Sequence, residues 1–248
     1  MKWVAVGDYD DLSRVAARIM LDALAANPLL VLGLPTGRTP EGMYARLVTE
    51  CASDYRCFRD VVTFNLDEYV GIAGDHPGSY SSYMRRHLID HVDIDPQSVH
   101  IPDGLATRFR DRASTFDEAL EMECDDYERS IREDGPIDLL YLGLGRNGHI
   151  GFNEPGTPFD SKTHVIQLSE STRNANAAHF PDGDVPQRAI TMGIGTILAA
   201  RRVILLASGE PKREAVRRLH KERENTDFPA SVLRGHPEVM VICDQETV

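Results

Sequence analysis

The sequence predicts an α/β fold in which a mostly parallel sheet is covered on both faces by helices, giving three layers. Strand-like and helix-like patterns alternate from end to end of the 248 residues, as they do in chains of βα units. Runs such as 29–35 (LLVLGLP) and 137–145 (IDLLYLGLG) are almost entirely apolar, which is typical of parallel strands buried on both faces. No internal repeat, low-complexity linker or break in composition is present, so we expect one α/β domain over residues 1–248.

Local patterns predict the individual elements. Each predicted strand is a short apolar run, and each predicted helix either has apolar residues at helical spacing or begins at a cap or a proline. Asp8, Asp10 or Asp11 is available as the N-cap of the first helix. The predicted strands are 2–7, 29–35, 61–66, 137–145, 163–169, 201–209 and 239–244. The predicted helices are 12–26, one from Pro40, 79–92, 115–134, 171–180 and one from Pro211.

Residues 115–134 form the most acidic segment, and an acidic functional tail is one interpretation of it. The segment also has an apolar stripe at helical spacing, a Thr115–Glu118 capping box, and a Gly135–Pro136 pair that ends the helix. These features favour an amphipathic helix whose acidic residues form a solvated face.

Composition excludes several classes of function. A formal net charge of −12 argues against nucleic-acid binding, because a duplex binder needs a basic face to neutralise phosphates. No apolar run approaches the roughly 20 residues of a membrane span, and the N-terminus turns acidic before a signal peptide could form. We therefore expect a cytoplasmic protein that binds neither nucleic acid nor membrane.

The four cysteines lie in segments that read as helix, loop, helix and strand. They lack the paired spacing of a zinc site. We expect buried or idle thiols and no metal centre. The cysteines are Cys51, Cys57, Cys124 and Cys243.

Four predicted strands end in polar residues that could carry chemistry. Ligands of open α/β sheets bind outside the carboxyl ends of the parallel strands, so we expect the four endings to share one rim. The endings are Thr36 to Pro40, Asp67–Glu68, Arg146 to His149, and Glu210 to Lys212.

The first ending has the composition of an anion-binding turn. It combines Gly37, two hydroxyls, a plausible N-cap at Thr39 and a proline at the first helical position. Free backbone N–H groups at a helix start attract an anion, and Lys212, at another helix start, would add charge. A purely structural turn fits the same residues.

Asp67 and His149 are candidates for proton transfer, although each also has a structural interpretation. Asp67 fits a turn aspartate, but burial or Glu68 could raise its pKa to that of a general base. His149 lies between glycines and five residues before Glu154, which could fix its tautomer. Arg173, near a predicted helix start, could pair with a phosphate or remain a surface arginine.

Several motifs together resemble the glucosamine-6-phosphate deaminase family, in the same order and at similar spacing from about residue 28 to 244. FNLDEY and GHIGFNEP are the most specific of them. The motifs are LGLPTGRTP, FNLDEYVG, HPGSYSSYMRRHLIDHVDI, GLGRNGHIGFNEPG, STRNANAAHF, VPQRAITMGIGTIL and ASGEPK.

The resemblance implies a doubly wound, Rossmann-like fold and conversion of glucosamine 6-phosphate and water to fructose 6-phosphate and ammonia, without a cofactor. It implies that His149, held by Glu154, opens the pyranose ring. Asp67 would then take the C2 proton and return it to C1. The positions that match phosphate and sugar binding are Thr36, Gly37, Thr39, Arg173 and Lys212.

Two features of the sequence, at three positions, depart from well-studied members of the family. Asn147 stands where some members have aspartate; an amide can orient His149 without stabilising its charged form, so we expect ring opening with a shifted pH profile. His164 and Ile166 stand where effector-regulated members have basic residues, so we expect weak or no activation by N-acetylglucosamine 6-phosphate.

Two rival functions are less consistent with these motifs. A 6-phosphogluconolactonase resembles this chain in fold, but Phe152-Asn153-Glu154-Pro155 favours the deaminase. A sugar-phosphate sensor of a transcription regulator needs a helix-turn-helix segment and a basic face, and the sequence indicates neither. The resemblance leaves open a homo-oligomer or a monomer, glucosamine or galactosamine 6-phosphate, and the effect of Arg38.

Overall fold

A seven-stranded sheet, parallel throughout, forms the centre of the computed structural model, which describes residues 1–52, 57–180 and 183–247. Its strand order is β1-β10-β9-β6-β2-β3-β5, so β2 and β6 are neighbours from which later strands extend in opposite directions. This arrangement confirms the predicted doubly wound α/β class. The strands are β1 (Lys2–Val6), β10 (Val239–Asp244), β9 (Val203–Ala207), β6 (Leu139–Gly143), β2 (Val31–Leu34), β3 (Val62–Asn65) and β5 (Val99–His100).

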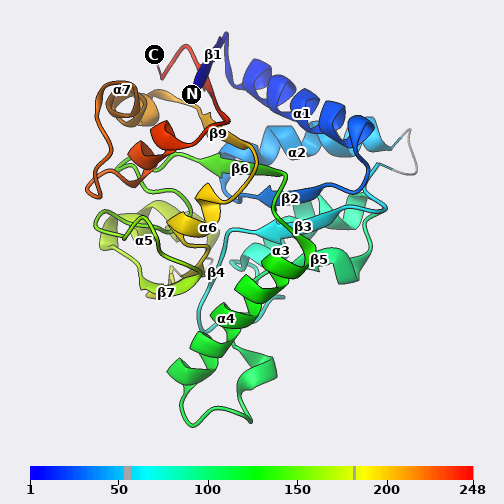
Figure 1. Cartoon of the computed structure of the whole chain (residues 1–248), viewed down its shortest axis with the longest axis vertical. Helices are drawn as coiled ribbons and strands as arrows, with labels where there is room; N and C mark the ends of the chain where they lie inside the picture. The colour runs from blue at the N-terminus through cyan, green and yellow to red at the C-terminus, as the bar shows by residue number, and fades with distance from the viewer. Residues whose placement is uncertain (53–56, 181–182, 248) are drawn as a thin grey trace.

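Helices cover both faces of this sheet (Figure 1). Leu139 and Tyr141 of β6 pack with the first group of helices, whereas Leu140 and Leu142 pack with the second, because successive strand residues point to opposite faces. The first group is α1 (Tyr9–Ala26), α2 (Arg38–Cys51) and α3 (Tyr80–His87). The second is α4 (Phe116–Asp134), α6 (Ile194–Leu198) and α7 (Arg213–Lys221). No helix in the described ranges is long and apolar enough to cross a membrane.

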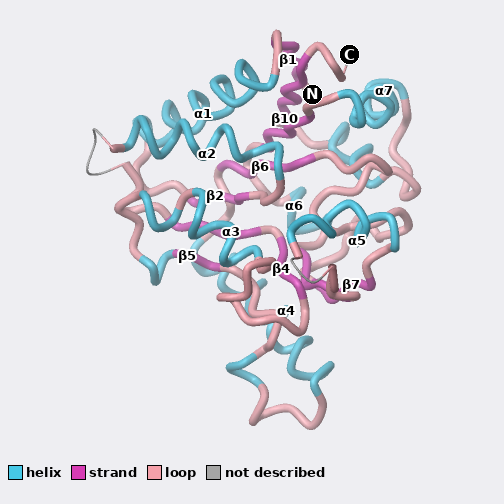
Figure 2. Tube along the Cα trace, turned by 180° about the vertical axis from the view of Figure 1, so that it is seen from behind, coloured by secondary structure: helices cyan, strands magenta, loops and turns pink. Residues whose placement is uncertain are grey.

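A second, three-stranded antiparallel sheet lies beside the main one (Figure 2). Residues 163–169 were expected to belong to the parallel sheet, but their strand lies here, and residues 188–191 gave no strand signal. Four residues are too few for a periodic pattern, and their pairing partners are distant in sequence. The strands are β4 (Asp67–Tyr69), β8 (Arg188–Thr191) and β7 (His164–Gln167), and α5 (Glu170–Asn176) follows β7.

The helix starts test the predicted caps. Asp8 caps α1 through the Asp11 N–H, and Thr115 caps α4 through the Glu118 N–H, both as expected. The prediction that Thr39 is an N-cap is wrong: α2 begins at Arg38 with Gly37 as the cap residue. Gly37 has φ +94°, a conformation that favours glycine, and the helix begins directly after it, one residue before Thr39.

Short 3₁₀ turns occupy much of the remaining chain. Two of them extend predicted helices, after α3 and after α5. They are Ile89–His91, Pro96–Ser98, Thr107–Phe109, Ala177–His179, Glu210–Lys212 and Pro229–Gly235.

The prediction of four free thiols is wrong for one pair. Cys51, at the end of α2, and Cys57 form a disulfide, with Cα atoms 5.6 Å apart. Spacing alone did not reveal this pair, because the two cysteines, six positions apart, form no paired-cysteine motif. Cys124 and Cys243 are free and buried, as predicted.

Candidate functional site

The four polar endings belong to four consecutive strands of the sheet. Strands β9, β6, β2 and β3 are neighbours and parallel, so their carboxyl ends lie along one rim. Between β2 and β6 the winding direction changes, which is where open α/β sheets bind ligands. Thr36 and Gly37 follow β2, and Asn147 and His149 follow β6.

Three tyrosine hydroxyls hold the turn after β2. Tyr44 donates to the Pro35 carbonyl at 2.6 Å, Tyr83 to Gly37 at 2.7 Å and Tyr9 to Arg38 at 3.0 Å. The carbonyls are therefore occupied by protein donors. The N–H groups at the start of α2, near Thr36 and Thr39, have no carbonyl acceptor within the helix, so they are suited to an anion.

A small cavity adjoins this turn. Thr36 lies against the Tyr80 hydroxyl, on the helix that follows Ser79. Asn176, at the end of α5, also lines the cavity, which brings that helix toward the turn. The lining residues are Gly37, Pro77, Gly78, Ser79, Tyr80, Tyr83, Arg86 and Asn176.

Asp67 is a buried carboxyl group without a protein donor. It begins β4 opposite Thr191 and is 6% exposed. Its side chain accepts no hydrogen bond from residues 1–52, 57–180 or 183–247. Burial, and to a lesser extent the charge of Glu68, raises the pKa of Asp67 to about 8. A pKa near neutrality is what a general base needs.

Glu68, the neighbouring acid, has a structural role that the sequence did not reveal. Its carboxylate accepts hydrogen bonds from the N–H groups of Tyr69, Tyr80 and Ser81 and from the Ser79 hydroxyl. Burial raises the pKa of Glu68 and these donors oppose the rise. Glu68 thus fixes the start of α3 against β4 and adds negative charge beside Asp67.

His149 and Glu154 are joined by Asn147. Asn147 Nδ2 donates to Glu154 Oε2 at 2.7 Å, and Asn147 Oδ1 lies 2.6 Å from His149 Nδ1. The expected hold of Glu154 on the imidazole is therefore indirect, with the amide between the two groups. Burial lowers the pKa of His149, although the Glu154 charge opposes this and Lys212 adds to it.

The hydroxyls of Ser169 and Thr172 contact the far side of Glu154. Ser169 Oγ donates to Glu154 Oε1 at 3.0 Å, and Thr172 Oγ1 donates to the same oxygen. Burial would raise the pKa of Glu154, but the hydrogen bonds from Thr172 and Asn147 outweigh it, so the pKa is lowered. Nothing local in the sequence linked these two hydroxyls to Glu154.

Gly151 connects the histidine loop to Asp67. A Cβ atom placed on Gly151 would lie 3.6 Å from Asp67 Oδ2 and 2.9 Å from Thr191 Oγ1. The backbone two residues after His149 therefore approaches the Asp67 carboxylate closely, with no room for a side chain. Asp67 and the loop that carries His149 therefore lie at the same part of the rim.

Lys212 follows β9 on this rim, and Arg173 lies on α5, whose Asn176 lines the cavity beside Gly37. Burial, followed by the charge of Arg146, lowers the pKa of Lys212. Within the described chain Lys212 has no carboxylate at ion-pair distance. Arg173 Nε is buried and has no hydrogen-bond partner. Unpaired cationic groups of this kind suit an anionic ligand.

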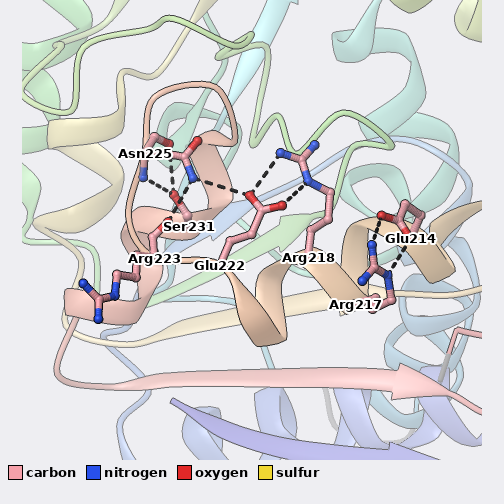
Figure 3. A network of polar contacts seen from close by, with 7 residues as sticks. All are labelled: Glu214, Arg217, Arg218, Glu222, Arg223, Asn225 and Ser231. Carbon is pink, nitrogen blue, oxygen red and sulfur yellow. Dashed lines mark hydrogen bonds and ion pairs between the residues drawn. The ribbon is translucent and has the colours of Figure 1, made fainter.

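A segment from Asn225 to Ser231 supports the histidine loop. The Ala230 N–H donates to the Gly148 carbonyl at 2.8 Å, and the Gly156 N–H donates to the Thr226 carbonyl at 2.8 Å. Figure 3 shows how the segment is held: Asn225 and Ser231 bond each other, and Asn225 reaches Glu222, which pairs with Arg218. The sequence gave no signal for this support.

The polar groups described above are carboxyl groups, an imidazole and cationic side chains. Among the residues that the structure describes, no group of three or more histidine, cysteine, aspartate or glutamate side chains could hold a metal ion.

Comparison with known proteins identifies close relatives over the whole length. Residues 9–241 match the family described as glucosamine-6-phosphate isomerases/6-phosphogluconolactonase. The chain is 46% identical over 247 residues to a glucosamine-6-phosphate deaminase of Shouchella clausii, covering 99% of this chain and 96% of the relative. It is also 46% identical over 247 residues to glucosamine-6-phosphate deaminase 1 of Bacillus subtilis, covering 99% and 98%.

Solved structures give the same picture of the fold. A monomeric glucosamine-6-phosphate deaminase superposes with a TM-score of 0.92 at 46% identity, covering 100% of this chain and 98% of that one. The 6-phosphogluconolactonase of Trypanosoma cruzi superposes with a TM-score of 0.79 at 22% identity, covering 99% and 95%. At that lower identity the likeness concerns the fold alone.

Proposed function

Because the chain belongs to the family of glucosamine-6-phosphate isomerases and 6-phosphogluconolactonases, we propose that it is a glucosamine-6-phosphate deaminase. The reaction converts glucosamine 6-phosphate and water to fructose 6-phosphate and ammonia, and it needs no cofactor. The observation that carries the proposal is the buried Asp67 carboxyl, with its pKa raised to about 8, beside the backbone of the loop that holds His149, whose pKa is lowered. Relatives with this activity cover nearly the full chain.

His149 opens the sugar ring in this proposal. Its Nε2 atom takes the proton of the C1 hydroxyl and returns a proton to the ring oxygen, so that the open-chain aldehyde forms. A lowered pKa keeps the imidazole neutral and able to accept that proton. Asn147 and Glu154 orient the ring through Nδ1.

Asp67 then moves one proton between adjacent carbons. It takes the proton from C2; the electron pair of the C2–H bond forms the C1–C2 double bond of the enolamine, and the C1 carbonyl pair moves to O1, which takes a proton from water. The Asp67 proton returns to C1 while the nitrogen lone pair forms the C2–N double bond of an iminium group. Water adds to C2 and passes one proton to the nitrogen; ammonia then leaves with the electron pair of the C–N bond as the remaining hydroxyl loses its proton and becomes the C2 carbonyl. A single carboxyl serves both carbons because C1 and C2 are bonded neighbours.

The anionic end of the substrate binds to the cationic part of the rim. We propose that Thr36 and Gly37, in the turn before α2, and Thr39, in the first turn of α2, provide hydroxyl and N–H donors. Lys212 and Arg173 provide positive charge, and neither forms an ion pair with a carboxylate of residues 1–52, 57–180 or 183–247. We also propose a cytoplasmic location, and a monomer as in the relative of that description.

The test is ammonia release by the purified protein. We expect release from glucosamine 6-phosphate and none without sugar, with galactosamine 6-phosphate measuring specificity at C4. Asp67→Asn serves as the matched control, since it preserves the shape of the side chain and removes the base. Hydrolysis of 6-phosphogluconolactone without ammonia release from either amino sugar would refute the proposal.

A further inference from the structure

Two hydroxyl groups at the start of α5 act on Glu154 from the side opposite to His149. Ser169 and Thr172 both donate to Glu154 Oε1, and their own oxygens are 3.0 Å apart. Thr172 is 5% exposed. The pair is thus a partly buried donor site for one carboxylate oxygen, while Asn147 serves the other oxygen.

This arrangement determines the orientation of the Asn147 amide. An ionised carboxylate can only accept hydrogen bonds, so Glu154 Oε2 must face the Asn147 amino group. The amide oxygen then faces His149 and also accepts from the His149 backbone N–H at 3.2 Å. While Glu154 is ionised, its carboxylate can only accept and the His149 backbone N–H can only donate. The two ends of the Asn147 amide therefore cannot be exchanged.

The orientation of the amide determines the tautomer of His149. An amide oxygen is an acceptor, so the Nδ1 atom at 2.6 Å must carry the proton. In a neutral imidazole Nε2 is then left with its lone pair. The Nε2 atom is the one that needs a free lone pair in order to accept a proton from a substrate.

We propose that Ser169 and Thr172 are positioning residues that hold Glu154 as an acceptor, and thereby hold His149 in the tautomer with Nε2 free. The inference rests on the proposed function for its catalytic meaning and deepens it. A protonated Glu154 could donate to the amide oxygen, which would turn Asn147 and present its amino group to His149. The imidazole would then carry its proton on Nε2 and be inactive as a base.

Few other charges face this group. His149 is the titratable side chain that acts on Glu154, and Lys212 acts on His149 from the turn after β9. Asn147, Ser169 and Thr172 are not ionisable. Losing a hydroxyl donor therefore raises the pKa of Glu154, and the form that turns the amide begins to populate at a higher pH.

The experiment compares Thr172→Val and Thr172→Ser with Thr157→Val. Valine keeps the shape of threonine and removes the donor, and serine restores the donor. Thr157 is the matched control because it is also buried and its hydroxyl donates at 2.7 Å to Glu154, but to the backbone carbonyl. Its loss perturbs the same residue without touching the carboxylate.

Two readouts are measured from pH 5 to pH 9. One is the nitrogen NMR spectrum of the histidine rings, with His149→Gln assigning the signal, which reports the tautomer without need of activity. The other is kcat/KM for glucosamine 6-phosphate. For Thr172→Val we expect the signal of protonated Nδ1 to weaken toward pH 5, and kcat/KM to fall there by up to about tenfold below the Asp67-limited curve of the parent.

Thr172→Ser should restore both readouts, and Thr157→Val should leave the tautomer and kcat/KM near pH 5 as in the parent. An unchanged tautomer in Thr172→Val, or an equal change in Thr157→Val, would overturn the inference. If Thr172→Val does not fold, Ser169→Ala removes the second donor and is judged by the same two criteria. A parent without ammonia release would overturn the proposed function, while the NMR comparison would still decide the tautomer question.

Discussion

Asp67 and Glu154 are both carboxyl groups at the mouth of one sheet, and for both, burial acts to raise the pKa. Asp67 has no protein donor in the described chain and a like charge beside it, so its pKa rises to about 8. Glu154 accepts from Asn147, Ser169 and Thr172, and its pKa falls. The supply of donors, more than burial, separates an acid that can exchange a proton near neutrality from one that stays charged.

Replacing Asp67, the carboxyl group without donors in the described chain, should have the largest effect on activity. For Asp67→Asn we expect kcat to fall by about 10²- to 10⁴-fold, the range for loss of a positioned general base. Ammonia release under saturating glucosamine 6-phosphate is the measurement. For the parent, kcat/KM should rise with pH until about pH 8, where Asp67 becomes ionised. Retention of more than a tenth of the parental kcat would rule out Asp67 as the base.

The same substitution should change stability in the opposite direction. The folded-state pKa of Asp67 is raised, so the folded protein retains a proton that the unfolded chain loses above about pH 4. Stability from this group therefore declines as the pH rises to about 8. We expect Asp67→Asn to unfold at a higher temperature than the parent at about pH 9, with a smaller gap at about pH 5. Thermal unfolding of both proteins at the two pH values is the check.

Asn147→Asp should have the next largest effect, because it puts a carboxyl group in place of the neutral amide between His149 and Glu154. A carboxylate at this place would face Glu154 Oε2, to which the amide now donates at 2.7 Å. Two acids at this distance cannot both ionise readily, so we expect the pH–rate curve to shift and kcat/KM to fall about tenfold near neutral pH.

Asn174→Asp, an exposed change on α5, controls for the added charge and should reproduce the parental curve. A curve for Asn147→Asp that matches the parent at every pH would contradict the role given to the amide.

Tyr83→Phe should have a smaller effect, confined to binding. Its hydroxyl holds the Gly37 carbonyl at 2.7 Å, and a hydrogen bond of this kind contributes about 1 kcal/mol. We expect KM for glucosamine 6-phosphate to rise about fivefold, with kcat nearly unchanged. Tyr141→Phe is the control, since that hydroxyl donates to the Ala16 carbonyl at 2.9 Å within the core. Equal KM changes in both variants would indicate a general loss of stability instead.

The smallest expected effect is that of N-acetylglucosamine 6-phosphate as an effector. His164 Nδ1 lies 2.8 Å from the Lys162 carbonyl, and Ile166 packs against the buried cluster that includes Tyr69 and Phe152. Neither side chain offers a phosphate a strong cationic partner. We expect kinetics with glucosamine 6-phosphate to be the same with and without this compound. A change in cooperativity on adding it would contradict the prediction.

The sequence by itself determined the order of most strands of the main sheet and the polar character of their ends. Apolar runs such as 29–35 and 137–145 predicted strands β2 and β6, and the Thr115 cap predicted the start of α4. These features depend on periodicity and capping among near neighbours. The polar endings could be recognised for the same reason, because each directly follows its strand.

Only the tertiary structure decided which of these residues meet. It placed β9, β6, β2 and β3 side by side, brought Thr172 to Glu154, and joined Cys51 to Cys57. It also moved residues 163–169 into a second sheet, and put the start of α2 before Thr39. Most of these outcomes depend on burial and hydrogen bonds between segments far apart in the chain, whose energies no local pattern contains. The contrast between Asp67 and Glu154 is of this kind, since donors from distant segments set the two pKa values apart.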